Sequence, residues 1–167
     1  MKERILTSLL TVFVITGIQS QSPAPVPRLV VGLTIDQLRA DYIEAFSALY
    51  GERGFKRLLK EGRIYTNAEY DFINVDRSSA TASIYTGTTP YYNGIPANRW
   101  MDRNSLRIIK SVDDQSFMGV YTSENSSAKL LHCSTLSDEL KVATQGQAEV
   151  YSIAPTREMA ILAAGHA

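Results

Sequence analysis

One apolar run near the beginning of the chain constrains its fold most. Residues 29–35 read LVVGLTI, lack a regular alternation of apolar and polar residues, and end at Asp36. A continuous apolar run that follows Pro27 and precedes helical periodicity is typical of a strand buried on both faces of a parallel sheet. The sequence therefore predicts an α/β fold whose first strand ends at Asp36.

The rest of the chain continues this alternation of strands and helices. Apolar spacings of three and four predict a helix over residues 38–49 and a shorter one from Phe55 that ends at Gly62. A strand is predicted at 63–75, a buried strand at 148–154 and an edge strand at 105–112. Crossover connections between such elements produce a mainly parallel central sheet flanked by helices.

Three further helices are marked by capping signals. A helix should begin near residues 76–79, another at Thr135 with Asp138 three residues later, and a third with Pro155 near its first turn. Because chemistry in α/β sheets gathers at the carboxyl ends of strands, Asp36 and the turn at 76–79 should lie close together.

The first 27 residues predict export. Lys2 and Arg4 precede an apolar run that ends at Ile18, so residues 1–20 resemble a signal peptide and residues 21–27 a Pro-rich leader. The alternative is a membrane anchor, but the run is short and diluted by polar residues. We therefore expect a periplasmic or extracellular domain over 28–167, with no stable membrane span after cleavage.

The charge and the cysteine content of the chain limit its binding partners and its disulfide bonds. Seventeen basic and seventeen acidic residues cancel, so no overall field attracts nucleic acid or an anionic membrane surface. The single cysteine, Cys133, forms no internal disulfide. Because the charges of the chain cancel, any recognition of an anion must be local.

The stretch DRSSATASIYTG, residues 76–87, resembles a turn that carries a nucleophile into a helix. Ser78 and Ser79 are nucleophile candidates, and a metal ion would have to activate them because only two histidines are present. The alternative is that either serine caps the helix. Arg77 allows a third interpretation, in which its guanidinium pairs with a phosphate or a carboxylate. Asp36 is likewise either a metal ligand or a helix cap.

Five blocks of sequence, in order, resemble the amino-terminal part of the alkaline phosphatase superfamily. They are VVGLTIDQLRADY, GFKRLLKEG, SATASIYTGTTPYYNGIPANRW, TLSDELK and ILAAGHA. The resemblance is strongest to the type I phosphodiesterase/nucleotide pyrophosphatase branch and its secreted bacterial alkaline phosphatases. It implies part of an alkaline-phosphatase-like sandwich.

The resemblance also assigns roles to individual residues. Asp36 matches an aspartate that ligates one of two zinc ions, and Asn98 matches an asparagine that contacts the phosphate. Arg77 occupies the position of the nucleophile, ten residues before Gly87, so Ser78 replaces it only if the turn shifts by one residue.

Two other features separate this chain from active relatives. Thr156 and Glu158 stand where a lysine and an arginine bind phosphate, with Arg157 between them. The family's remaining zinc ligands lie in segments beyond this chain, which implies a truncated product. Two functions follow: a metal-dependent hydrolase of phosphate mono- or diesters, or a non-catalytic relative that binds a small anionic ligand or a partner through Arg77.

Overall fold

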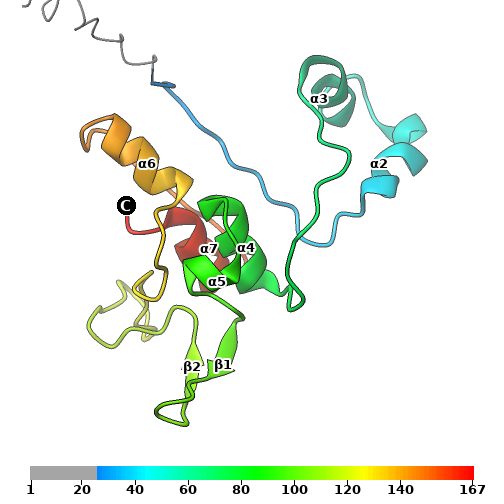
Figure 1. The fold of residues 1–167 in the computed structure, drawn as a ribbon. Coiled ribbons are helices and arrows are strands. Elements are labelled where there is room, and N and C mark those ends of the chain that lie inside the picture. Colours follow the sequence, from blue (N-terminus) through cyan, green and yellow to red (C-terminus); the bar gives the residue numbers. More distant parts are fainter. Residues whose placement is uncertain (1–25) are drawn as a thin grey trace, which may run out of the picture. The chain divides into compact units, whose positions relative to one another are not determined.

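The computed structural model describes residues 26–167, and Figure 1 shows its ribbon. The predicted signal peptide and most of the leader lie outside the described residues. The elements are α2 (Ala40–Ala45), η1 (Ser47–Leu49), α3 (Phe55–Glu61), α4 (Arg77–Thr86), α5 (Pro90–Asn93), β1 (Arg99–Met101), β2 (Ile108–Lys110), α6 (Leu136–Ala143) and α7 (Arg157–Ala164).

Helix α4 lies at the centre of the packed part of the chain. It contacts α5, α6 and α7, and α6 also contacts α7. The buried apolar side chains beneath these helices come from α4, α7 and the loops between them: Ala82, Ile95, Val112, Ala128, Leu131 and Leu162. Removal of these side chains from water is the main force that holds the helices together.

Most predicted helices are confirmed. The segment predicted at 38–49 divides into α2 and η1, and α3 ends at Gly62 as expected. Helix α6 begins with the predicted capping box, in which Thr135 and Asp138 bond each other's backbone N–H, and it ends at Ala143. Helix α7 begins at Arg157, with Thr156 rather than Pro155 beside its first turn.

The parallel sheet predicted from the apolar runs is not formed by the described residues. Their only sheet is the antiparallel pair β1 and β2, in which Trp100 faces Ile109. Strand β2 confirms the edge strand predicted at 105–112. The three other predicted strands, 29–35, 63–75 and 148–154, are wrong, because none of these segments is paired as a strand.

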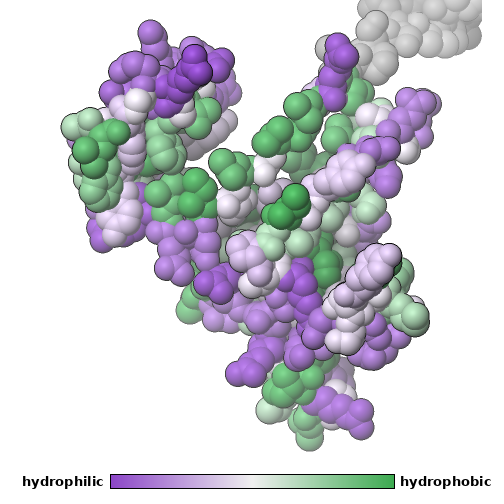
Figure 2. Space-filling model, turned by 180° about the vertical axis from the view of Figure 1, so that it is seen from behind, coloured by the Kyte–Doolittle hydropathy of each residue, from purple (hydrophilic) through white to green (hydrophobic). Residues whose placement is uncertain are grey.

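Most apolar side chains of those segments are exposed, and none is fully buried. Leu33 is 80% exposed and Ile153 98% exposed, and Figure 2 shows apolar side chains among hydrophilic ones on one face of the molecule. A buried parallel strand needs neighbouring strands for its backbone hydrogen bonds and layers over both faces. Residues 26–167 supply neither for these segments.

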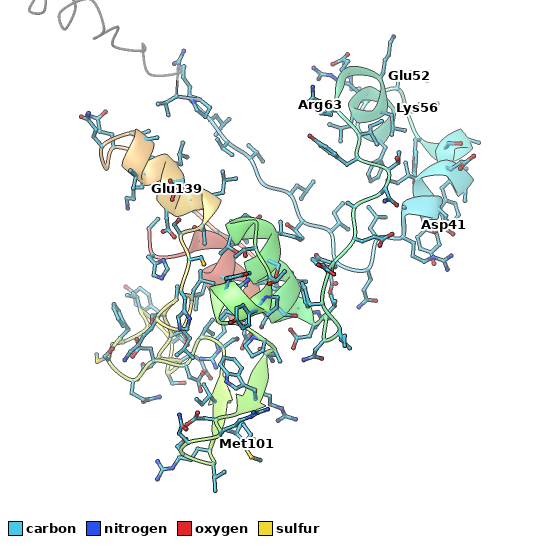
Figure 3. All side chains as sticks on the ribbon, in the orientation of Figure 1. Asp41, Glu52, Lys56, Arg63, Met101 and Glu139 are labelled. Atoms are coloured by element: carbon cyan, nitrogen blue, oxygen red, sulfur yellow. The ribbon has the colours of Figure 1, made fainter. Side chains whose placement is uncertain are left out.

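The amino-terminal helices are held by local contacts. None of the residues in α2, η1 and α3 is buried. Glu52 and Lys56, both labelled in Figure 3, form an ion pair of 3.2 Å between positions i and i+4. Among the helices within residues 26–167, none combines the length and hydrophobicity that a bilayer crossing requires.

A carboxylate organises the loop that follows β2. Asp114 accepts hydrogen bonds from the hydroxyl groups of Ser116, at 2.6 Å, and Ser127, at 2.7 Å. Together with the Ser116 backbone N–H and the charge of Lys129, these bonds lower the pKa of Asp114 to about 2. The carboxylate therefore stays ionised and joins the two ends of the loop.

Candidate anion-binding site

The turn before α4 is built around Asp76. Its Oδ1 accepts the backbone N–H of Ser79 at 2.9 Å, and the Ser79 hydroxyl oxygen accepts the backbone N–H of Asp76 at 2.9 Å. This capping box satisfies backbone groups that the first turn of a helix leaves without partners. The N-cap residue is therefore Asp76, and Ser79 is the second member of the box. The alternative that Ser78 or Ser79 is itself the N-cap residue is wrong.

Asp76 also holds the loop that carries Asn98. The second carboxylate oxygen, Oδ2, accepts the backbone N–H of Asn98 at 2.5 Å, while the Asn98 carbonyl accepts the N–H of Ser111 at 2.9 Å. The Ser78 hydroxyl donates to Asn98 Oδ1 at 3.1 Å. Asn98 is thus fixed beside the beginning of α4, as its expected role as a phosphate contact requires.

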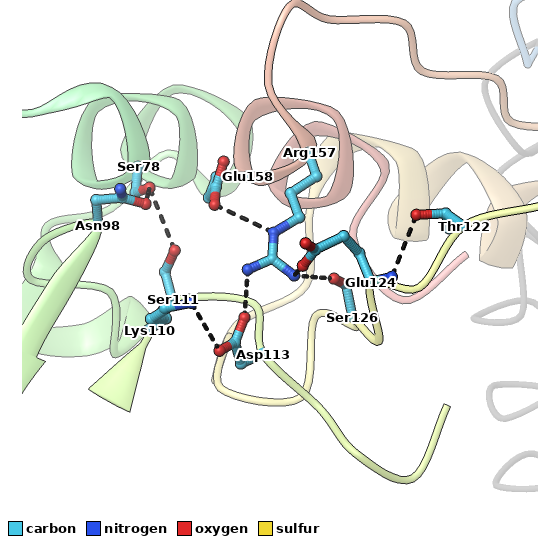
Figure 4. Close-up of polar contacts among 10 residues, drawn as sticks. All are labelled: Ser78, Asn98, Lys110, Ser111, Asp113, Thr122, Glu124, Ser126, Arg157 and Glu158. Atoms are coloured by element: carbon cyan, nitrogen blue, oxygen red, sulfur yellow. Dashed lines mark hydrogen bonds and ion pairs between the residues drawn. The ribbon is translucent and has the colours of Figure 1, made fainter. Parts of the chain in front are cut away.

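Ser78 lies in a buried chain of hydroxyl groups. Its side chain has no exposed surface, and its Oγ accepts a hydrogen bond from the equally buried Ser111 at 3.2 Å. Ser78 accepts from Ser111 and donates its own proton to Asn98 Oδ1. Figure 4 shows the three side chains close together. A nucleophilic serine needs a base to take its proton. Neither partner of Ser78, the Ser111 hydroxyl or the Asn98 side-chain amide, is such a base.

Arg77, the first residue of α4, turns toward Asp36. Its Nε donates to Asp36 Oδ2 at 2.7 Å, and the side chains are 56% and 42% exposed. The structure therefore brings together the two residues expected to meet at the strand end, and the guanidinium pairs with a carboxylate. Asp36 does not cap the next helix, because the residue before α2 is Arg39 and it makes no side-chain capping bond.

Two cavities adjoin Arg77. A cavity of about 340 Å³ is lined by Asp76, Arg77, Ser78, Asn98, Thr156 and Glu158. A second, of about 410 Å³, contains Asp36 and Tyr70 among its walls. Burial and the charge of Asp36 raise the pKa of Tyr70, so its hydroxyl stays protonated beside that carboxylate.

Arg157 points away from the first cavity. Its guanidinium bonds Asp113, donates to Ser126 Oγ at 2.8 Å and pairs with Glu124 at 2.8 Å and Glu158 at 3.3 Å, as Figure 4 shows. Partial burial disfavours its charge, but the bond to Asp113 and the negative charges of Asp113, Glu124 and Glu158 together outweigh that effect and raise the pKa of Arg157. Arg157 therefore ties α7 to the loop after β2 and does not replace the basic pair that the resemblance implies.

The described residues do not fit a zinc site. Asp36, the expected ligand, accepts a hydrogen bond from Arg77 at its Oδ2. Residues 26–167 contain no cluster of three or more His, Cys, Asp or Glu side chains able to hold a metal ion. Zinc sites in proteins take three or four such ligands. Residues 26–167 therefore lack the set of ligands that a zinc ion needs.

Comparison with known proteins identifies the family. Residues 30–145 match the type I phosphodiesterase/nucleotide pyrophosphatase family, and the chain belongs to it. Alkaline phosphatase PafA of Elizabethkingia meningoseptica is 34% identical over 96% of this chain and 30% of its own length. Alkaline phosphatase PhoV of Synechococcus elongatus is 41% identical over 84% of this chain and 26% of its own length.

A solved structure extends this likeness to the fold. The crystal structure of wild-type PafA superposes with a TM-score of 0.81 at 34% identity, over 87% of this chain and 29% of that one. The predicted fold class, part of an alkaline-phosphatase-like α/β domain, is confirmed. The chain spans less than a third of the length of each of these relatives.

Two residues of the site were missed by sequence reasoning. Asp76 lies in the turn that the sequence singled out, and a carboxylate three residues before Ser79 is a capping signal that could have identified it. Ser111 lies 33 positions from Ser78, within a segment predicted only as an edge strand. No local pattern marked it.

Proposed function

We propose that this chain binds a phosphate ester at the beginning of α4 without transferring the phosphoryl group. One observation carries the proposal: the residue at the nucleophile position is Arg77, whose Nε is paired with Asp36 at 2.7 Å. The guanidinium is not a nucleophile, because it stays protonated in proteins. Its terminal nitrogens Nη1 and Nη2 make no hydrogen bond within residues 26–167 and are available as donors.

The charge of the first cavity favours a singly charged ligand. Arg77 is its only cationic wall residue, whereas Asp76 and Glu158 are both acidic. Like charges held close together in a partly enclosed space repel each other. A phosphodiester, with one negative charge, is therefore a better ligand than a phosphomonoester dianion.

Asn98 supports the same ligand class. Its backbone and Oδ1 are held by Asp76, Ser111 and Ser78, so the side-chain amino group, Nδ2, keeps a fixed position beside the cavity. Preorganised donors bind an anion without a further cost of ordering. Arg77 and Asn98 would then contact different oxygens of one phosphate.

Turnover and binding are separated by one chromogenic probe, bis(4-nitrophenyl) phosphate. Release of 4-nitrophenolate reports hydrolysis, and calorimetry reports binding, each with added zinc and with a chelator. We expect binding that Arg77→Ala removes, and no release of nitrophenolate. Glu61→Gln, which removes an exposed carboxylate paired with Arg57 at 2.8 Å, is the matched control and should bind as the unmodified chain does.

The second candidate is a metal-dependent phosphoric ester hydrolase with Ser78 as nucleophile. The alkaline phosphatases among the relatives favour it, and so does the position of Ser78 beside Asn98. Zinc would need ligands beyond residues 26–167 in addition to Asp36. Zinc-dependent turnover that Ser78→Ala abolishes and Ser79→Ala retains would establish this function and contradict the first.

We also propose that the protein is exported and that the chain is the amino-terminal part of a longer domain. The charged and apolar pattern of residues 1–20 supports export. The share of each relative that the chain covers supports the second statement. Detection of the mature chain in the periplasm or medium, with its new amino terminus sequenced, tests export.

A further inference from the structure

The contact between Arg77 and Asp36 suggests why this site differs from a metal centre. The hydrogen bond joins Arg77 Nε to Asp36 Oδ2 across 41 positions of sequence. A cation at Asp36 would have to share or displace this bond, because the guanidinium already lies against that oxygen. Arginine cannot give up its proton to make room, so its charge remains at any ordinary pH.

We propose that Arg77 takes the place of a metal ion as the cation at Asp36, and that Asp36 is an internal counter-ion which competes with the anionic ligand for Arg77. This inference rests on the proposed function, since the ligand that competes is the phosphate ester. It makes anion binding independent of divalent metals. It also makes Asp36 an inhibitor of binding and not a contributor to it.

The position of Arg77 is well defined by the turn. Arg77 is the first residue of α4. It follows Asp76, which caps the helix, and precedes Ser78, which is fully buried. The base of the side chain is therefore fixed, and only its outer part can move between Asp36 and the cavity of about 340 Å³ that Arg77 also lines.

The exposure of the pair makes the competition possible. Both side chains are partly exposed, at 56% and 42%. Ion pairs in contact with water are weak and are screened by salt. An anion that binds Nη1 and Nη2 can therefore draw the guanidinium away from Asp36 without leaving a buried charge behind.

Calorimetric titration of the full chain with bis(4-nitrophenyl) phosphate, in a chelator, tests the role of Asp36. Asp36→Asn keeps the shape of the side chain and removes its charge. We expect it to tighten binding by about two- to fivefold, the effect of removing one exposed competing ion pair. Glu61→Gln is again the control and should leave the affinity unchanged. Weaker binding by Asp36→Asn would overturn the proposal.

A second measurement decides the metal question without relying on the ester. The Nε–H resonance of Arg77, identified by its loss in Arg77→Ala, should shift in Asp36→Asn and stay unchanged when zinc is added in molar excess. Zinc that shifts this resonance in the unmodified chain, but not in Asp36→Asn, would show that Asp36 is a metal ligand and overturn the proposal. If the probe binds to no variant, the proposed function fails, and this resonance alone decides whether Arg77 replaces the metal.

Discussion

Replacement of Asp76 is the sharpest test of how the site is built. Its carboxylate accepts two backbone N–H groups that lie far apart in sequence, from Ser79 at 2.9 Å and from Asn98 at 2.5 Å. Asp76→Ala removes both bonds at once. The change therefore weakens the beginning of α4 and releases the loop that carries the expected phosphate contact.

The loss in free energy of unfolding caused by Asp76→Ala can be worked out from the two hydrogen bonds. Loss of an N-cap side chain costs about 1 kcal/mol. Loss of a hydrogen bond to a charged group costs about 1.5 kcal/mol at the lower end of its range, which suits the exposed Asn98. We expect Asp76→Ala to lower the free energy of unfolding by about 2 to 3 kcal/mol, a substantial share of the ~5–15 kcal/mol typical of a domain. Urea unfolding followed by circular dichroism measures this.

A matched variant separates the two bonds. In Asp76→Asn the side-chain oxygen can still accept the N–H of Ser79, because asparagine is as good an N-cap residue as aspartate. The side-chain NH₂ group then faces the backbone N–H of Asn98 and cannot accept its hydrogen bond. Hydrogen exchange should then accelerate at the Asn98 amide and stay slow at the Ser79 amide. An Asp76→Ala variant within about 0.5 kcal/mol of the unmodified chain, the usual range for surface substitutions, would refute the reasoning.

Three further predictions concern the stability of the packed part. Leu162→Ala, at a fully buried core position, should cost about 2 to 5 kcal/mol in urea unfolding, whereas Leu106→Ala, 74% exposed, should change little. Gly165→Ala should cost about 2 to 4 kcal/mol, because φ is +72° and a Cβ would overlap the Thr135 hydroxyl, so a neutral result would contradict this geometry. The pKa of Asp114 falls from 3.8 to about 2 on folding. The contribution of its carboxylate to the free energy of unfolding is therefore present above about pH 4 and is lost as the pH falls through 2. Urea midpoints of the unmodified chain and Asp114→Asn should therefore converge between pH 5 and 2, and a constant difference would exclude this linkage.

Local signals explain which expectations about the fold were met. A capping box needs only two residues three positions apart, so Thr135 and Asp138 marked the beginning of α6. Gly62 ended α3 for the same kind of local reason. Strand predictions from apolar runs failed at residues 29–35 and 148–154, since a strand exists only where another segment accepts its hydrogen bonds. Hydrophobicity reports a tendency to be buried and says nothing of the partner.

The sequence alone determined the family and the turn before α4, and it predicted Arg77 at the family's nucleophile position, because these depend on residue type and spacing along the chain. Only the tertiary structure decided what each side chain does. It placed Arg77 against Asp36 and buried Ser78 under Ser111, contacts between segments 41 and 33 positions apart. Such contacts depend on how helices and loops pack, which no local spacing encodes.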